Sequence, residues 1–199
     1  MKKQVIVAAV LAALAASSAF AQQADGPWQM RVRAIHLDSV DKDSTGLGLG
    51  INDKWLPEVD FSYYFTPHWA AELVLTVPQK QTLTSSVLNT KVGTFKHLPP
   101  TLTVQYHFLP TGSVRPYVGA GLNYTRFSSE KLLPGVDIDS SSVGGALQVG
   151  VDIPVAKNLY LNLDLKKVFI DTDVRVAGAK VGTLKVNPVL FGVGLGWRF

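Results

Sequence analysis

Charged residues recur at alternate positions inside segments that are otherwise apolar. Nine of them, of both signs, follow this pattern: Arg31, Arg33, Glu58, Asp60, Glu72, Asp152, Asp164, Lys166 and Arg198. Charges that face a protein interior are tolerated only when they are paired and hydrogen-bonded. Two roles stay open for these residues. They form either a salt-bridged network that fills and blocks a narrow interior, which we expect, or a path for ions or protons.

Residue types used in catalysis and metal binding show no comparable pattern. The chain has no Cys, and its four His residues match no metal-ligand spacing. His97 with Asp41 or Asp173 is a conceivable hydrolytic pair, although nothing in their spacing favours it. The glycines of Gly46–Gly50 are not followed by the helix of a phosphate-binding loop. We therefore predict no catalytic residues, no enzyme activity, no cofactor and no metal site.

A second set of residues follows the same alternation but is apolar. Its members are Ile35, Leu37, Leu56, Val74, Pro78, Pro99 and Leu190. An apolar lining on an inward face suits an oily guest better than an ion or a sugar. The alternative is a packed core beneath the loops, and the residues alone do not separate the two.

The start of the chain predicts export from the cytoplasm. Lys2 and Lys3 precede a short apolar run, and the small residues of Ala19-Phe20-Ala21 follow it. This is typical of a signal peptide over residues 1–21, which is removed before Gln22. The rest, residues 22–199, is then one domain with a formal charge of about +2. Without a run of Lys and Arg, we expect no nucleic-acid partner.

The remaining chain alternates with period two, as a β-strand with one apolar and one polar face does. A clear example is Val59, Phe61, Tyr63 and Phe65 set against Glu58, Asp60, Ser62 and Tyr64. Eight segments show the pattern: 28–34, 58–65, 69–77, 101–108, 118–125, 143–153, 159–166 and 189–199. No stretch after Ala21 reaches 18 consecutive apolar residues, so a transmembrane helix is not predicted.

The connections between these segments alternate in length. Short ones fall near 66–68, 109–114 and 154–158, and longer polar ones near 38–54, 78–96, 128–142 and 171–185. This predicts an all-β fold, an eight-stranded antiparallel transmembrane β-barrel with short periplasmic turns and longer extracellular loops. A soluble β-sandwich also alternates. Inward glycines and aromatic residues at the segment ends favour the barrel, because they suit a crowded bore and a membrane interface.

A barrel of this kind belongs in the outer membrane of a Gram-negative bacterium, with outer-membrane lipid as its first partner. Arg126 and Lys167 are the charged exceptions on the apolar faces, where their stems could reach the headgroups. The last strand ends on Phe199, a terminal aromatic residue that resembles the signal read by the barrel insertion machinery.

Four segments resemble the OmpW family of small outer-membrane barrels. They are His97-Leu98-Pro99-Pro100-Thr101-Leu102, Arg115-Pro116-Tyr117-Val118-Gly119-Ala120-Gly121-Leu122-Asn123-Tyr124-Thr125, Gln148-Val149-Gly150-Val151-Asp152 and Asp171-Thr172-Asp173. The ending from Asn187-Pro188 to Phe199 is similar to that family's last strand. The resemblance covers essentially the whole chain after the signal peptide.

The resemblance implies a narrow hydrophobic channel for passive uptake of small hydrophobic solutes, with release sideways through the wall. Pro99 and Pro100 fit such a lateral opening, since neither can donate a ladder hydrogen bond. A simple bulge or strand end is the alternative. The competing function is a structural or receptor-type barrel without transport. The chain departs from the family at Lys166-Lys167, where relatives often have an aromatic pair, and at Asn187, where Asp is usual.

Overall fold

A computed structural model describes residues 26–39, 42–44, 46–76, 79–132 and 135–199. The predicted signal peptide, Asp41 and Pro78 lie outside these residues. Within the described ranges, no helix has the length and apolar character needed to cross a membrane.

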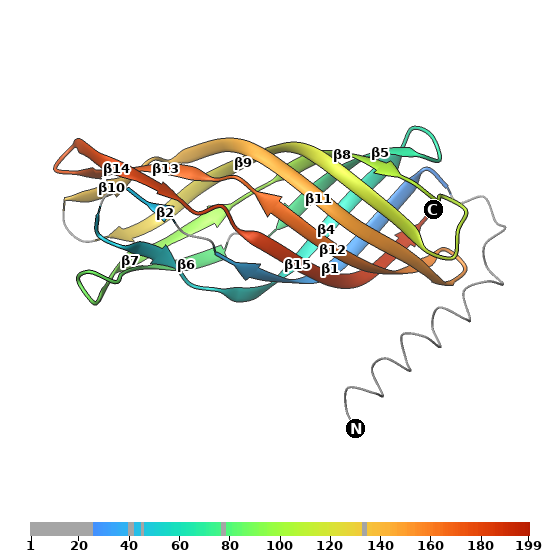
Figure 1. The fold of residues 1–199 in the computed structure, drawn as a ribbon, viewed down its shortest axis with the longest axis horizontal. Coiled ribbons are helices and arrows are strands. Elements are labelled where there is room, and N and C mark those ends of the chain that lie inside the picture. Colours follow the sequence, from blue (N-terminus) through green and yellow to red (C-terminus); the bar gives the residue numbers. More distant parts are fainter. Residues whose placement is uncertain (1–25, 40–41, 45, 77–78, 133–134) are drawn as a thin grey trace, which may run out of the picture.

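Eight strands close into an antiparallel ring, which confirms the predicted barrel (Figure 1). They are β1 (Trp28–Asp38), β4 (Lys54–Tyr64), β5 (Trp69–Thr76), β8 (Thr101–His107), β9 (Arg115–Leu132), β11 (Ser141–Ala156), β12 (Leu159–Val168) and β15 (Val189–Arg198). Each pairs with the next, and β15 pairs with β1 from Gln29–Arg198 to Asp38–Val189. Closure leaves no free edge, so the backbone N–H and C=O groups are paired within the protein, as lipid requires.

The predicted alternation sets the two faces of the wall. On β8, Thr103 and Gln105 are completely buried, whereas Leu102 and Val104 are half exposed on the outside. Exposed aromatic side chains mark both ends of the apolar band. Trp55 on the outside of β4 and Phe65, directly after that strand, lie ten residues apart. A tilted strand of that length spans roughly 25 Å, the height of the apolar band of an outer-membrane barrel.

One end of the barrel carries the short turns that the sequence predicts. The turns cover residues 65–68, 108–114 and 157–158. The C-terminus lies at this end, where Phe199 and Trp28 exchange backbone hydrogen bonds of 2.8 and 3.0 Å. We call this the periplasmic end.

The opposite, outer end differs from the prediction, because the expected long polar loops are largely strands. They contain β2 (Lys42–Asp43), β3 (Leu49–Ile51), β6 (Gln79–Ser85), β7 (Thr90–Leu98), β10 (Val136–Ile138), β13 (Asp171–Val176) and β14 (Ala179–Lys185). Strands β3, β6 and β7 extend the barrel sheet, and β10, β13, β14 and β2 form a separate four-stranded sheet. The reason is an apolar core: Leu49, Leu83, Val92, Phe127, Ile138, Ala146, Val168, Ile170, Val174, Leu184 and Val186 pack together.

The β13–β14 hairpin is expected to weaken only in strong acid. Asp173 accepts a hydrogen bond from Thr183 Oγ1 at 2.8 Å, and its Oδ2 lies 2.6 Å from Lys180 Nζ. The hydrogen bond from Lys180, and then that from Thr183, lowers the pKa of Asp173 below its ordinary 3.8. A depressed pKa stabilises the folded state above the ordinary value, and this stabilisation disappears as the pH falls through the lowered pKa. Carboxyl chemical shifts should therefore give Asp173 a pKa below 3.8. Amide hydrogen exchange in β14 should accelerate only when the pH falls below that value. A midpoint above 3.8 would contradict this assignment.

Candidate functional site

Arg31 lies at the centre of a buried ionic network in the half of the bore nearer the periplasmic end. Its guanidinium binds Asp152 through two contacts, Nη2 to Oδ2 at 2.7 Å and Nε to Oδ1 at 3.2 Å. Its Nη1 lies 3.2 Å from both Asp60 Oδ1 and Glu72 Oε2. The network therefore joins β1, β4, β5 and β11 across the interior.

Arg33 and Lys166 form the layer of the network toward the outer end. Arg33 Nε lies 2.9 Å from Glu58 Oε1, and its Nη2 lies 2.5 Å from Asp60 Oδ2. Lys166 Nζ lies 3.5 Å from Glu58 Oε1 and 3.9 Å from Asp164 Oδ1. Because all these side chains are buried, their charges depend on one another rather than on water.

Uncharged side chains complete the network, and the sequence analysis missed them. Gln148 Nε2 donates to Glu72 Oε1 at 3.0 Å and to Asp164 Oδ2 at 2.7 Å. Tyr117 Oη donates to Asp164 Oδ2 at 2.7 Å. A Cβ atom at Gly150 would lie 2.4 Å from Tyr117 Oη, so only glycine leaves room for this ring. The alternation of the sequence places Gln148 and Tyr117 at inward positions of their strands, but as uncharged residues they did not stand out from their neighbours.

The structure brings together eight of the nine charged residues that the sequence placed in the interior. They are Arg31, Arg33, Glu58, Asp60, Glu72, Asp152, Asp164 and Lys166. Arg198 lies at the periplasmic end, where it borders a small pocket together with Asp152. Its guanidinium lies 3.6 Å from the ring centroid of Tyr64, and its Nε donates to Gly26 O at 2.8 Å. That the network blocks the bore stays a prediction.

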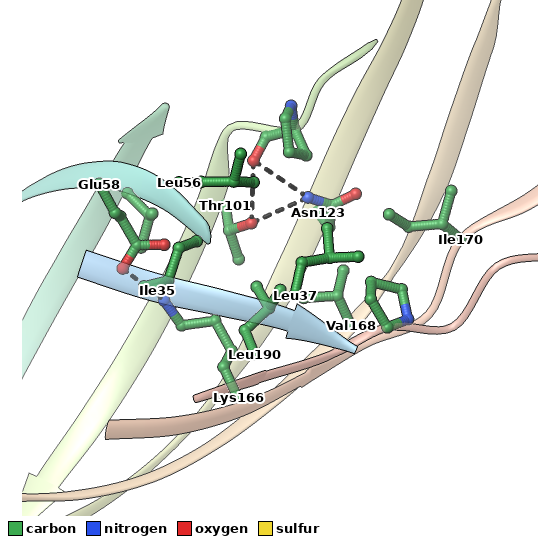
Figure 2. A pocket seen from close by; sticks show the side chains of 13 residues that line it. Ile35, Leu37, Leu56, Glu58, Thr101, Asn123, Lys166, Val168, Ile170 and Leu190 are labelled. Atoms are coloured by element: carbon green, nitrogen blue, oxygen red, sulfur yellow. Dashed lines mark hydrogen bonds and ion pairs between the residues drawn. The ribbon is translucent and has the colours of Figure 1, made fainter. Parts of the chain in front are cut away.

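An apolar cavity lies directly on the outer side of this network (Figure 2). It is lined by Ile35, Leu37, Leu56, Glu58, Val74, Pro99, Thr101, Asn123, Lys166, Val168, Ile170, Pro188 and Leu190. Glu58 and Lys166 form its polar floor, where they meet in an ion pair. The Lys166 stem contributes apolar surface to the cavity while its ammonium group points into the network. The cavity volume is about 30 Å³.

Every described residue that the sequence placed in the apolar lining borders this one cavity. These are Ile35, Leu37, Leu56, Val74, Pro99 and Leu190. Three further lining residues were not predicted: Val168 at the end of β12, Ile170 just after it and Pro188 just before β15. Val168 continues the inward positions of β12, so alternation could have found it, whereas Ile170 and Pro188 lie outside the strands and carry no such signal.

A smaller cavity continues from the first toward the outer end. The two share Leu37, Ile170 and Pro188, and the smaller one is also lined by Ile51, Thr125, Phe127 and Val186. Phe127, Ile170 and Val186 belong to the apolar core of the outer end. Apolar side chains thus border the interior from the Glu58–Lys166 floor up into that core.

The wall beside the cavity has an interruption in its hydrogen-bonded ladder at Pro99 and Pro100. Pairing of β5 with β8 ends at Val74–Thr101, and pairing resumes between β6 and β7 at Gln79–His97. On the opposite side β9 stays attached, since Tyr124 N donates to Pro100 O at 3.0 Å. Of the residues that the structure describes, which exclude 77 and 78, none pairs with Pro99 or Pro100 from the β5–β6 side, and lateral opening itself stays a prediction.

Asn123 reaches from β9 to this interruption and was not predicted. Its Nδ2 donates to Thr101 Oγ1 at 2.8 Å and to the carbonyl oxygens of Pro99 and Pro100, both at 3.3 Å (Figure 2). Thr125 Oγ1 donates to Asn123 Oδ1 at 2.7 Å and fixes the orientation of the amide. Asn123 therefore holds the proline pair against β9 and borders the cavity at the same time.

The family departures at Lys167 and Asn187 are neighbours in space. Lys167 Nζ donates to Asn187 O. Asn187 Oδ1 accepts from Ile170 N at 3.0 Å, and its φ of 33° lies in the left-handed region that Asn tolerates. Together they join the end of β12 to the start of β15 beside the cavity.

The conceivable hydrolytic pair gains nothing from the structure. Asp41 lies outside the described residues, and the Asp173 carboxylate is bound to Lys180 and Thr183. Among the described residues, no group of three or more His, Asp or Glu could hold a metal ion.

Comparison with known proteins matches this architecture. A sequence profile described as the OmpW family matches residues 27–199. The outer-membrane protein y4mB of Sinorhizobium fredii is 39% identical over 184 residues, covering 87% of this chain and 80% of the relative. Outer membrane protein W of Vibrio cholerae is 33% identical over 219 residues and covers 100% of both chains. Dibenzothiophene metabolism operon protein PahQ of Pseudomonas aeruginosa is 30% identical over 147 residues, 70% of this chain and 69% of that protein.

Among solved structures, the outer membrane protein OprG of Pseudomonas aeruginosa has a TM-score of 0.77. The match is 24% identical and covers 89% of this chain and 98% of that one, so it supports the fold. With the profile covering almost the whole described chain, this protein belongs to the OmpW family and is a β-barrel of the Gram-negative outer membrane.

Proposed function

We propose that the protein is a passive conduit through which small hydrophobic molecules enter the outer membrane. The observation that carries the proposal is the apolar cavity on the outer side of the buried ionic network. Its walls are aliphatic side chains from β1, β4, β5, β12 and β15, with few polar groups. Such a lining offers no compensation for the lost hydration of an ion or a sugar. An oily solute has no such hydration to lose, so it enters without a desolvation penalty.

Entry requires movement of the lining. A volume of about 30 Å³ has room for about two water molecules and is too small for an alkane chain or a fused aromatic ring. Rotamer changes of Leu37 and Leu56 would widen it, because both end in flexible aliphatic groups facing the space. Transport is then a sequence of small side-chain displacements without an external energy source.

Passage straight through the barrel is opposed by the network. An apolar solute that moved past Glu58 and Lys166 would separate buried ion pairs, at roughly 3–5 kcal/mol for each broken pair. The wall at Pro99 and Pro100 is an easier exit, since neither proline can donate a ladder hydrogen bond and, among the described residues, neither takes part in β5–β8 or β6–β7 pairing. Release through the wall places the solute in the hydrocarbon layer, where it is soluble.

A relative lends independent support. PahQ is named as a protein of a dibenzothiophene metabolism operon, and dibenzothiophene is an apolar fused-ring compound. A hydrophobic aromatic or aliphatic solute of that size class is therefore the substrate we propose.

The test is uptake with and without the protein. Cells that express the chain and cells with an empty vector receive a radiolabelled alkane or polycyclic aromatic compound, and initial uptake is measured over a range of concentrations. Conduit activity predicts a several-fold higher initial rate that an uncoupler does not change. Equal rates would end the proposal and favour a structural or receptor role.

Replacing Asn123 by Ala should make the wall easier to open. Loss of about 1 kcal/mol of net hydrogen bonding to Thr101, Pro99 and Pro100 favours the open wall by about fivefold. Uptake should rise by a similar factor if lateral exit limits the rate. Asn162→Ala, which also loses buried amide hydrogen bonds but lies in the network, is the matched control and should leave uptake unchanged. Equal uptake in N123A and N162A would remove Asn123 from the exit.

A further inference from the structure

A basic strip runs across the outside of three neighbouring strands, just above the apolar band. It consists of Lys80 on β6, Lys96 on β7 and Arg126 on β9, all exposed to solvent. Lys80 and Lys96 are direct cross-strand partners, and Lys96 pairs with Ser128, two residues from Arg126. With strands about 4.8 Å apart, the three backbone positions fall within about 10 Å of one another, inside the reach of their long side chains.

The strip is electrostatically unfavourable by itself. Like charges directly opposite on adjacent strands destabilise a sheet. Of the carboxylates whose side chains the structure describes, none lies within ion-pair distance of Lys80, Lys96 or Arg126. An external anion between these cations would relieve the repulsion.

The height of the strip on the wall indicates which anion is available. On β9 the outward side chains Leu122 and Tyr124 are 68% and 49% exposed, and Arg126 is the next outward residue. A step of two residues along a tilted strand is about 5 Å, which carries Arg126 from the hydrocarbon boundary into the headgroup layer. The outer leaflet of a Gram-negative outer membrane consists of a glycolipid whose headgroup carries phosphate groups at this level.

The strip also differs from two other exposed lysines of the outer end, which lie beside carboxylates: Lys180 Nζ is 2.6 Å from Asp173 Oδ2, and Lys185 is the cross-strand partner of Asp171. At comparable positions elsewhere on the outer rim, the exposed outward residues include Asp38 at the end of β1, Ser141 at the start of β11 and Asp171 after β12. Clusters of Lys and Arg beside the membrane are a sequence feature that indicates binding of phosphorylated lipid headgroups.

We propose that Lys80, Lys96 and Arg126 form a binding site for a phosphorylated glycolipid of the lipid A type in the outer leaflet. The ammonium and guanidinium groups bind phosphate oxygens, with the Arg126 fork suited to two parallel hydrogen bonds. The acyl chains lie below, along Leu102, Leu122 and Tyr124 on the outside of β8 and β9. The site adjoins the proline pair, but it does not depend on the proposed transport function.

The test is native mass spectrometry of the full processed chain released from micelles that contain diphosphorylated lipid A. We expect one lipid A to stay bound to the wild type, and the double variant K80Q/K96Q to bind at least tenfold more weakly. K157Q/K185Q removes two exposed lysines from other parts of the surface and should bind as the wild type does. K96R keeps the charge and should also retain binding.

Two further arms identify the bound chemistry. The affinity of the wild type for lipid A without phosphate groups should be no higher than the affinity of K80Q/K96Q for diphosphorylated lipid A. Inorganic phosphate should not compete at millimolar concentration, because it lacks the acyl chains. Equal lipid A binding by the wild type and K80Q/K96Q, retention of dephosphorylated lipid A, or displacement by inorganic phosphate would each overturn the proposal.

Discussion

Replacing Leu56 by Arg should abolish uptake of hydrophobic solutes while leaving the barrel assembled. Leu56 is 5% exposed and projects from β4 into the apolar cavity. A guanidinium group there brings bound water into the cavity, and an apolar solute must displace that water. Only ~1.4 kcal/mol added to the barrier slows passage tenfold, and desolvating a charged group costs more than that. Initial uptake should therefore fall at least tenfold.

The L56R variant remains foldable because the cavity floor supplies a partner. Glu58, which borders the same cavity as Leu56, lies within reach of a long side chain at position 56. Leu88→Arg, at the exposed tip between β6 and β7, is the matched control and should transport normally. Heat-modifiable migration on gels verifies assembly of both variants. Wild-type uptake by assembled L56R would exclude this cavity from the path.

Replacing Arg31 by Met should cause the largest loss of stability in the barrel. The methionine fills similar space but leaves Asp60, Glu72 and Asp152 without their shared cation. Removing one partner of a buried ion pair typically costs about 3–5 kcal/mol in the free energy of unfolding. Urea unfolding in lipid vesicles, followed by tryptophan fluorescence, measures the change.

The control for R31M is the same substitution in an exposed ion pair. Arg175 pairs with Asp139 at the outer end, and their side chains are 40% and 33% exposed. Water compensates the separated charges there, so R175M should cost about 1 kcal/mol or less. Similar unfolding midpoints for R31M and R175M would mean that the network does not stabilise the half of the barrel nearer the periplasmic end.

Much of the architecture could be predicted because a membrane barrel leaves a strict trace in the sequence. Lipid outside and a narrow bore inside give every strand residue one of two environments, so period two identifies the strands and assigns each face. The same rule selected the apolar lining around Leu56 and the network around Arg31, since inward residues of neighbouring strands at one height must meet.

The outer end could not be predicted because its residues do not face the hydrocarbon layer. The inward residues there include Val174, Leu184 and Val186. Their outward neighbours face water, so they are not required to be apolar. Glycines at the turns interrupt the alternation further. The sequence therefore indicates loops where the chain forms β13 and β14. Asn123 was missed for a different reason: its hydrogen bonds go to the backbone carbonyls of two prolines, 23 and 24 positions away, and to the Thr101 hydroxyl, which no spacing rule reveals.

The most direct measurement of solute entry is covalent capture inside the barrel. The protein is placed in lipid nanodiscs with an alkane that carries a photoreactive diazirine, and labelled residues are mapped by mass spectrometry. The account predicts adducts on cavity residues such as Leu37, Leu56 and Leu190, with none on buried Gln105 and Tyr160 below the network. Lipid-facing residues such as Leu122 are labelled in any case and serve as the internal control. Labelling of the lipid-facing residues alone, with no adduct in the cavity, would contradict the proposed conduit.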